Sequence, residues 1–127
     1  MGGRRHALRL GPRDPLCDYH LRPDASAEFV NEVAAGTDAD VLVLGHTHWP
    51  LLRTHGELQM ANPGSVGQPL DGDPRAAYAV WEDGKITPRR AKYDQAPVLT
   101  ALGRLPIDRP LRDALGSMLR LARLDGG

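Results

Sequence analysis

The feature that most constrains the fold is a run of four apolar residues, 41–44, which ends at Gly45 and leads directly into two histidines. Such a short, continuously apolar run is typical of a strand covered on both faces inside the sheet of an α/β protein. Open α/β sheets place their functional sites beyond the carboxyl ends of such strands. We therefore predict a buried strand at about 40–45 that delivers His46 and His48 on a loop.

The spacing of the two histidines indicates a candidate metal site. Two imidazoles at positions i and i+2 of an irregular loop can reach a pair of adjacent metal ions, and neutral imidazole is the commonest metal ligand among side chains. The alternative is a chance pair on a surface loop, because the chain has five histidines. The following strands, predicted at 51–54 and 58–61, fold straight back and return the chain close to His46 and His48.

The remaining elements follow in order along the chain. Residues 1–24 are rich in Arg, Pro and Gly and are expected to be irregular. A helix then begins at a cap formed by Asp24 or Ser26 and ends at Gly36. Strands at 76–82 and 85–93 are joined by Asp83-Gly84, which is a favoured two-residue hairpin turn. Two helices are expected over 95–127, and the leucine stripe at 111–122 is expected to lie in the core or an interface.

The length and composition of the chain are those expected of a single domain. The 127 residues are 41% hydrophobic and carry 16 basic and 16 acidic side chains, so no broad field attracts nucleic acid or an anionic membrane. The single cysteine, Cys17, fits a reducing compartment. No stretch has the length of a membrane span, and the N-terminus lacks the apolar core of a secretion signal. We expect a cytoplasmic protein without nucleic-acid or membrane partners.

Two motifs together resemble a known family. Residues 45–50, Gly-His-Thr-His-Trp-Pro, are followed by residues 62–67, Asn-Pro-Gly-Ser-Val-Gly. This pair resembles the carboxyl-terminal half of the calcineurin-like metallophosphoesterases, in particular their small bacterial phosphodiesterase branch. Residues 73–80, 92–94 and, upstream, 11–16 with Tyr19 continue the resemblance over nearly the whole chain.

The resemblance implies a fold and an activity. The family stacks two β-sheets between helical layers (α/β/β/α), so we expect residues 1–127 to form a partial β-sandwich with a mixed sheet flanked by helices. Family members hydrolyse phosphoesters with two divalent ions, and Mn, Fe, Ni or Zn all suit the ligand types. By matching positions, His46 binds one metal and His48 the other, while Thr47 points away. Asn62, Gly64 and Ser65 then lie beside the substrate phosphate.

The resemblance also predicts an incomplete site. The family takes further ligands from Asp-x-His, Gly-Asp, Gly-Asn-His and His-Gly motifs. We expect only its Gly-His-x-His pair in this chain, and neither an Asp-x-His nor a Gly-Asn-His motif. Where the family has a histidine ligand upstream, this chain aligns Arg9, whose guanidinium has no lone pair to donate. We therefore expect no catalytic residue within the chain, doubtful metal occupancy and no activity of the isolated chain.

Two functions from different classes stay open. The chain is either the carboxyl-terminal part of a metallophosphoesterase or a non-catalytic scaffold that binds proteins through the same fold. The loop at 62–67 is likewise either a phosphate contact or a turn between strands. We also expect the strand at 40–45 to present an unpaired edge, which favours self-association or binding of a complementing N-terminal fragment. Asp71, Asp73 and Glu82 are expected to be solvated turn residues.

Overall fold

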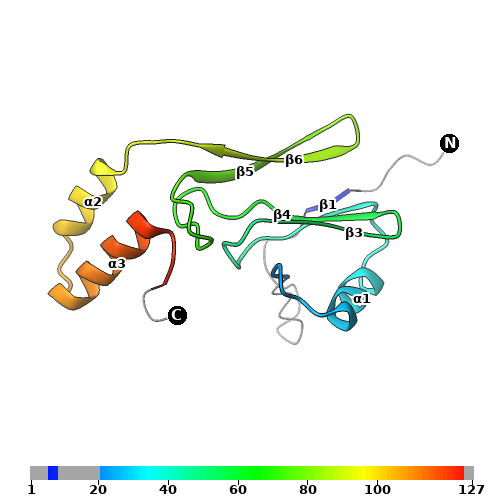
Figure 1. Ribbon diagram of the computed structural model, residues 1–127, viewed down its shortest axis with the longest axis horizontal. Helices are drawn as coiled ribbons and strands as arrows, with labels where there is room; N and C mark the ends of the chain where they lie inside the picture. The colour runs from blue at the N-terminus through cyan, green and yellow to red at the C-terminus, as the bar shows by residue number, and fades with distance from the viewer. Residues whose placement is uncertain (1–5, 9–20, 125–127) are drawn as a thin grey trace.

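A computed structural model describes residues 6–8 and 21–124 and shows a mixed α/β fold (Figure 1). The larger sheet contains β1 (His6–Leu8), β2 (Val41–Val43), β3 (Leu51–His55) and β4 (Leu58–Asn62), in the order β1-β2-β4-β3. β2 runs parallel to β1 and β4, whereas β3 and β4 form an antiparallel hairpin. The predicted mixed sheet is confirmed.

A second, two-stranded sheet consists of β5 (Ala76–Glu82) and β6 (Lys85–Ala91). Asp83 and Gly84 between them have φ of 50° and 75°, and positive φ at both central residues characterises the type I′ turn. The predicted hairpin and its turn are therefore confirmed. Ile86 of β6 clusters with Val41 and Ala61, so the hairpin covers one face of the larger sheet.

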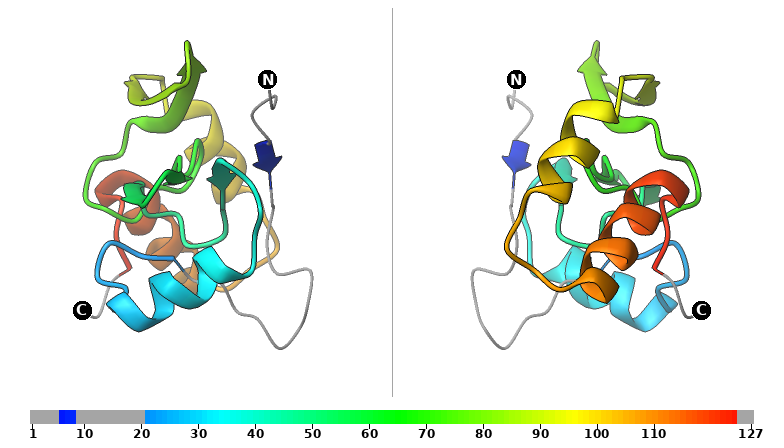
Figure 2. Two further views of the ribbon diagram at one scale, coloured as in Figure 1. Left: turned by 90° about the vertical axis from the view of Figure 1, so that its right-hand side faces the viewer. Right: turned by 90° about the vertical axis from the view of Figure 1, so that its left-hand side faces the viewer.

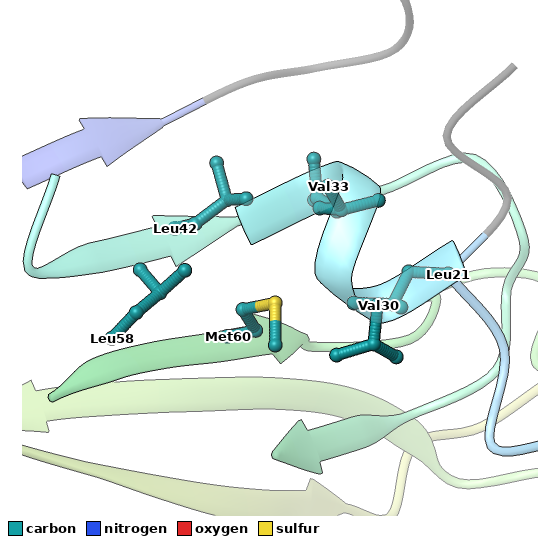
Figure 3. Close-up of a cluster of buried hydrophobic side chains, with 7 residues drawn as sticks. Leu21, Val30, Val33, Leu42, Leu58 and Met60 are labelled. Atoms are coloured by element: carbon teal, nitrogen blue, oxygen red, sulfur yellow. The ribbon is translucent and has the colours of Figure 1, made fainter. Parts of the chain in front are cut away.

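Helix α1 (Ala27–Ala35) covers the opposite face of the larger sheet, as Figure 2 shows. Ser26 caps it by accepting a hydrogen bond at its Oγ from the backbone N–H of Phe29 at 3.2 Å, and Gly36 ends it, as predicted. The apolar side chains between α1 and the sheet form the main core (Figure 3). This core contains Leu21, Val30, Val33, Leu42, Leu44, Leu58 and Met60.

Alternation along the strands decides which side chain meets which layer. Successive residues of a strand face opposite sides of a sheet. Leu42 and Met60 therefore belong to the core under α1, whereas Val41 and Ala61 belong to the cluster under the hairpin. β2 is thus covered on both faces, which explains its continuously apolar sequence.

Helices α2 (Ala96–Gly103) and α3 (Arg109–Leu121) lie beside the sheets, at the opposite end of the molecule from α1 (Figure 1). The end of α3 is attached by hydrogen bonds from Gln68 Nε2 to Met118 Sδ (3.2 Å) and from the Gly72 N–H to the Ala122 carbonyl (2.9 Å). Met118 and Ala122 are buried, whereas Leu111 is exposed. The predicted leucine stripe is therefore buried mainly at its C-terminal end.

Two predictions about the larger sheet were wrong. His6–Leu8, within the segment expected to be irregular, forms β1. β2 does not present an unpaired edge, because β1 and β4 flank it on its two sides. Both errors have one cause: a three-residue strand has no periodicity of its own, and its pairing with residues 41–43 is set by a contact far away in sequence.

Some predictions lie outside the described residues. These are the ones that concern Cys17, Tyr19, Arg9 and residues 11–16. Within the described ranges, no helix is both long enough and apolar enough to cross a membrane.

Candidate functional site

The loop after β2 places both histidines at the centres of tight turns. His46 and His48 have φ of 74° and 60°, in the left-handed region that residues other than glycine rarely adopt. The Thr47 N–H donates to the Gly45 carbonyl at 3.0 Å, which closes a γ-turn around His46. Thr47 Oγ1 accepts from the Trp49 N–H at 3.3 Å, which closes a second short turn around His48.

Asn62, at the end of β4, lies against this loop. Its side-chain nitrogen donates to the Gly45 carbonyl at 3.1 Å and to Thr47 Oγ1 at 2.8 Å, and its oxygen accepts from the Gly64 N–H at 2.9 Å. Asn62 is only 2% exposed, so these partners replace the water that the amide would otherwise bind. The expectation that strands β3 and β4 return the chain to the histidine loop is confirmed.

His48 is oriented by a carbonyl on the next loop. Its Nδ1 lies 2.8 Å from the Gln68 carbonyl oxygen, and His48 is half-buried. A carbonyl can only accept, so this contact assigns a proton to Nδ1, and in the neutral ring the lone pair is then on Nε2. Metal-ligating histidines usually donate their second ring nitrogen in this way. His46, in contrast, is exposed.

Gly64 and Ser65 connect the histidine loop to β5. Gly64 has a φ of 86°, and a Cβ on it would lie 2.9 Å from both Ala77 Cβ and Pro50 Cγ. Ser65 accepts from the Gln68 N–H through its Oγ and from the Ala77 N–H through its carbonyl, both at 3.0 Å. These contacts give the segment a structural role, and its contact with a substrate stays a prediction.

Arg22 places a cation beside the loop that the sequence did not predict. The guanidinium carbon of Arg22 lies 5.3 Å from the centre of the Trp49 ring, within the range of a cation–π interaction. Arg22 follows Leu21, which is fully buried and fixes the segment before α1. Because the contact joins residues far apart in sequence, no local pattern predicts it.

Asp71 and Asp73 lie in the expected turn and are partly exposed, but both carboxylates form ion pairs that were not predicted. Arg90 pairs with the Asp71 carboxylate and donates at 3.1 Å to the backbone carbonyls of Asp73 and Arg75. Asp73 is bound by the Arg75 side chain at 2.6 Å, and hydrogen bonds from this side chain and from the Arg75 N–H lower the pKa of Asp73 to about 2. Glu82 is exposed, in line with the prediction.

The described residues alone do not gather a complete metal site. No group of three or more His, Cys, Asp and Glu side chains among them is close enough to hold an ion. The expectation that the sequence lacks an Asp-x-His spacing was wrong, because Asp18 and His20 have this spacing; both lie outside the described ranges.

Comparisons with known sequences identify relatives that are longer than this chain. The model of the calcineurin-like phosphoesterase superfamily domain matches residues 6–84. Phosphodiesterase YfcE of Escherichia coli (strain K12) is 48% identical over 48 residues, which are 38% of this chain and 26% of YfcE. The uncharacterized protein MJ0912 of Methanocaldococcus jannaschii is 32% identical over 100 residues, covering 65% of this chain and 39% of MJ0912.

Solved structures agree on the fold. A metallophosphoesterase from Sphaerobacter thermophilus superposes with a TM-score of 0.76 at 25% identity, over 96% of this chain and 56% of that one. The hypothetical protein PH1004 from Pyrococcus horikoshii OT3 gives a TM-score of 0.67 at 15% identity, over 85% and 45% of the two chains. This chain thus spans about half of each solved relative and less of the two sequence relatives.

Proposed function

Because this chain belongs to the calcineurin-like phosphoesterase superfamily, we propose that it forms part of a metal-dependent phosphoester hydrolase site in which His46 and His48 bind divalent metal ions. The observation that carries the proposal is the 2.8 Å contact between His48 Nδ1 and the Gln68 carbonyl. Because Nδ1 donates to this carbonyl, Nε2 on the other side of the ring is the nitrogen left to bind a metal ion. The name of YfcE supports a phosphodiester as the substrate class.

The residues of this chain fit one part of that chemistry. Divalent ions bound in such a site polarise phosphate oxygens and lower the pKa of bound water. The chain contributes two imidazoles, which suit Mn, Fe, Ni and Zn. Asn62 and the Gly64 N–H are hydrogen-bonded to each other, so the proposed phosphate contact of Asn62, Gly64 and Ser65 falls mainly to the Ser65 hydroxyl hydrogen.

Two histidines are fewer protein ligands than the three that a catalytic zinc site typically uses. We therefore propose that the isolated chain binds metal weakly and has no appreciable hydrolase activity. The remaining ligands would come from residues outside the described ranges or from a complementing N-terminal fragment. The proposed location remains the cytoplasm, on the basis of the sequence alone.

Metal titration and a hydrolysis assay test this proposal together. With Mn²⁺ or Ni²⁺, bis-p-nitrophenyl phosphate should be hydrolysed no faster by the wild type than by His48→Ala. Calorimetry should show metal binding weaker than micromolar that His46→Ala and His48→Ala remove. His55→Ala, at the exposed end of β3, is the matched control and should leave it unchanged. Turnover that depends on His48 would contradict the proposed inactivity, and binding insensitive to both loop variants would contradict the ligand assignment.

A second candidate function is a protein-binding module, and the outer face of the β5–β6 hairpin favours it. Tyr78 and Val80 on this face are 41% and 39% exposed and pair across the hairpin with Arg89 and Thr87. The proposed partners are a second copy of the chain or the complementing fragment. In size-exclusion chromatography with light scattering, a dimer that Tyr78→Ser converts to a monomer would support this function. A wild-type monomer at every concentration would exclude self-association.

A further inference from the structure

We propose that Asn62 and Thr47 are positioning residues that hold His46 and His48 together by bracing the two consecutive turns around them. The proposal rests on the proposed metal binding by these two histidines. It assigns a role to two side chains that do not themselves bind the metal.

The first turn is braced at both of its ends. The Gly45 carbonyl and Thr47 flank His46, and the same carbonyl accepts from the Thr47 N–H at 3.0 Å. The Asn62 side-chain nitrogen donates to this carbonyl at 3.1 Å and to Thr47 Oγ1 at 2.8 Å. One amide group therefore ties together the residues before and after His46.

The second turn uses the same hydroxyl oxygen. Thr47 Oγ1 accepts the Trp49 N–H at 3.3 Å, so this oxygen sets the backbone around His48 while Asn62 holds the oxygen. Beyond the turn, His48 Nδ1 reaches the Gln68 carbonyl. Loss of Thr47 Oγ1 should therefore disturb the direction of both imidazoles, although no ligand is removed.

The brace is needed because both turns are unfavourable by themselves. A γ-turn with positive φ at its centre is rare and strained, and left-handed backbone at two histidines separated by one residue adds to that strain. Asn62 is 2% exposed and bonded through both its nitrogen and its oxygen, so the buried amide has little freedom to follow a relaxing loop. The loop is therefore held in place before any metal binds.

The test compares Thr47→Val, which keeps the side-chain shape but removes the oxygen, with Thr47→Ser, which restores it. Thr54→Val, on an exposed threonine of β3, is the matched control. Long-range ¹H–¹⁵N spectra of the imidazoles, assigned with His46→Ala and His48→Ala, report the tautomer and follow a Zn²⁺ titration. Thermal denaturation checks that each variant folds.

We expect His48 to carry its proton on Nδ1 in the wild type, Thr47→Ser and Thr54→Val, and to become a mixture of tautomers in Thr47→Val. Zinc affinity should fall about tenfold in Thr47→Val but not in Thr47→Ser or Thr54→Val, as for other residues that orient metal ligands. Asn62→Asp, which keeps an acceptor for the Gly64 N–H but loses both donors, should reproduce this loss.

An unchanged His48 tautomer together with an affinity within twofold of the wild type in Thr47→Val would overturn the positioning proposal. The two proposals fail separately. If zinc leaves the His46 and His48 signals of the wild type unmoved, the proposed metal binding is wrong, and the tautomer comparison alone decides whether Thr47 positions the histidines.

Discussion

Two loops of this chain wrap around a polar side chain, and they differ in where they place backbone strain. Residues 45–49 fold onto Asn62, a neutral amide that is 2% exposed, whereas residues 71–75 fold onto Arg90, whose side chain is 17% exposed. The left-handed residues of the first loop are histidines. In the second loop the left-handed residue is Gly72, for which this conformation costs little.

This difference is the one expected between a loop that forms the proposed site and a loop that attaches neighbouring elements to each other. Arg90 links residues 71–75 to β6, and the Gly72 N–H links them to the end of α3. The polar groups in these contacts are therefore bound within the protein. The first loop has histidines at two positions with positive φ, where glycine would have less backbone strain. Strain retained without glycine is the stronger sign of function.

The largest expected effect is a difference between two glycines with nearly the same backbone. Gly64 and Gly72 have φ of 86° and 85°, but a Cβ would meet Ala77 and Pro50 at 2.9 Å only at Gly64, and at Gly72 nothing lies within 4 Å. Gly72→Ala should lower the free energy of unfolding by about 1 kcal/mol through left-handed strain alone. Gly64→Ala should lower it by about 3 kcal/mol because steric overlap is added.

Urea denaturation of both variants measures this difference. Equal losses would mean that the contacts of Gly64 with Pro50 and Ala77 relax easily. The segment beside the histidine loop would then be no more rigid than residues 71–75, and the comparison between the two loops would fail.

A smaller effect of opposite sign is expected at His46. His46→Gly removes the strain of a left-handed non-glycine residue and should raise the free energy of unfolding by about 1 kcal/mol. Metal binding in the calorimetric titration should be lost in the same variant. The matched control is His55→Gly, which places glycine in a strand and should lower stability by about 0.5 to 1 kcal/mol. A stability loss at His46 comparable to that at His55 would show that the loop is not strained.

The elements that the sequence predicted correctly are those encoded by neighbouring residues. The apolar run 41–44 marks β2, Ser26 begins α1, and Asp83-Gly84 closes the β5–β6 hairpin. β1 was missed because His6–Leu8 becomes a strand only through its pairing with β2. Local chemistry determines where such elements start and stop, but it does not determine which distant segment completes a sheet.

The same division applies to the candidate site. The spacing of His46 and His48 predicts them as candidate ligands because a motif is a local property, and their metal binding stays a prediction. The return of β4 to the histidine loop was predicted, but the loop groups that the Asn62 amide binds were not, because they depend on the exact placement of two segments distant in sequence. The contact of Arg22 with Trp49 was missed for the same reason. The role of Arg90 was also missed, because its partners lie in a distant loop. From the sequence alone, the two aspartates of that loop look like ordinary solvated turn residues.

The smallest expected effect concerns the charge pair of the second loop. The pKa of Asp73 is lowered to about 2, first by the hydrogen bonds from the Arg75 side chain and then by the Arg75 N–H. A carboxylate with a lowered folded-state pKa stabilises the fold above its unfolded pKa of about 3.9, and this contribution is lost as the pH falls from about 4 to about 2. Arg75→Gln should raise the pKa of Asp73 part of the way, because the backbone N–H remains.

An NMR titration of the Asp73 carboxyl group measures this shift, and Arg89→Gln, on the outer face of β6, is the control that should leave it unchanged. Denaturation between pH 4 and pH 2 should show a shallower acid loss of stability in Arg75→Gln than in the wild type. The change should be small because both side chains are partly exposed and water screens the pair. Zinc binding at neutral pH should not change, since the pair has no contact with the histidine loop among its described hydrogen bonds. A change in zinc affinity would show that the two loops are coupled and that the division between them is incomplete.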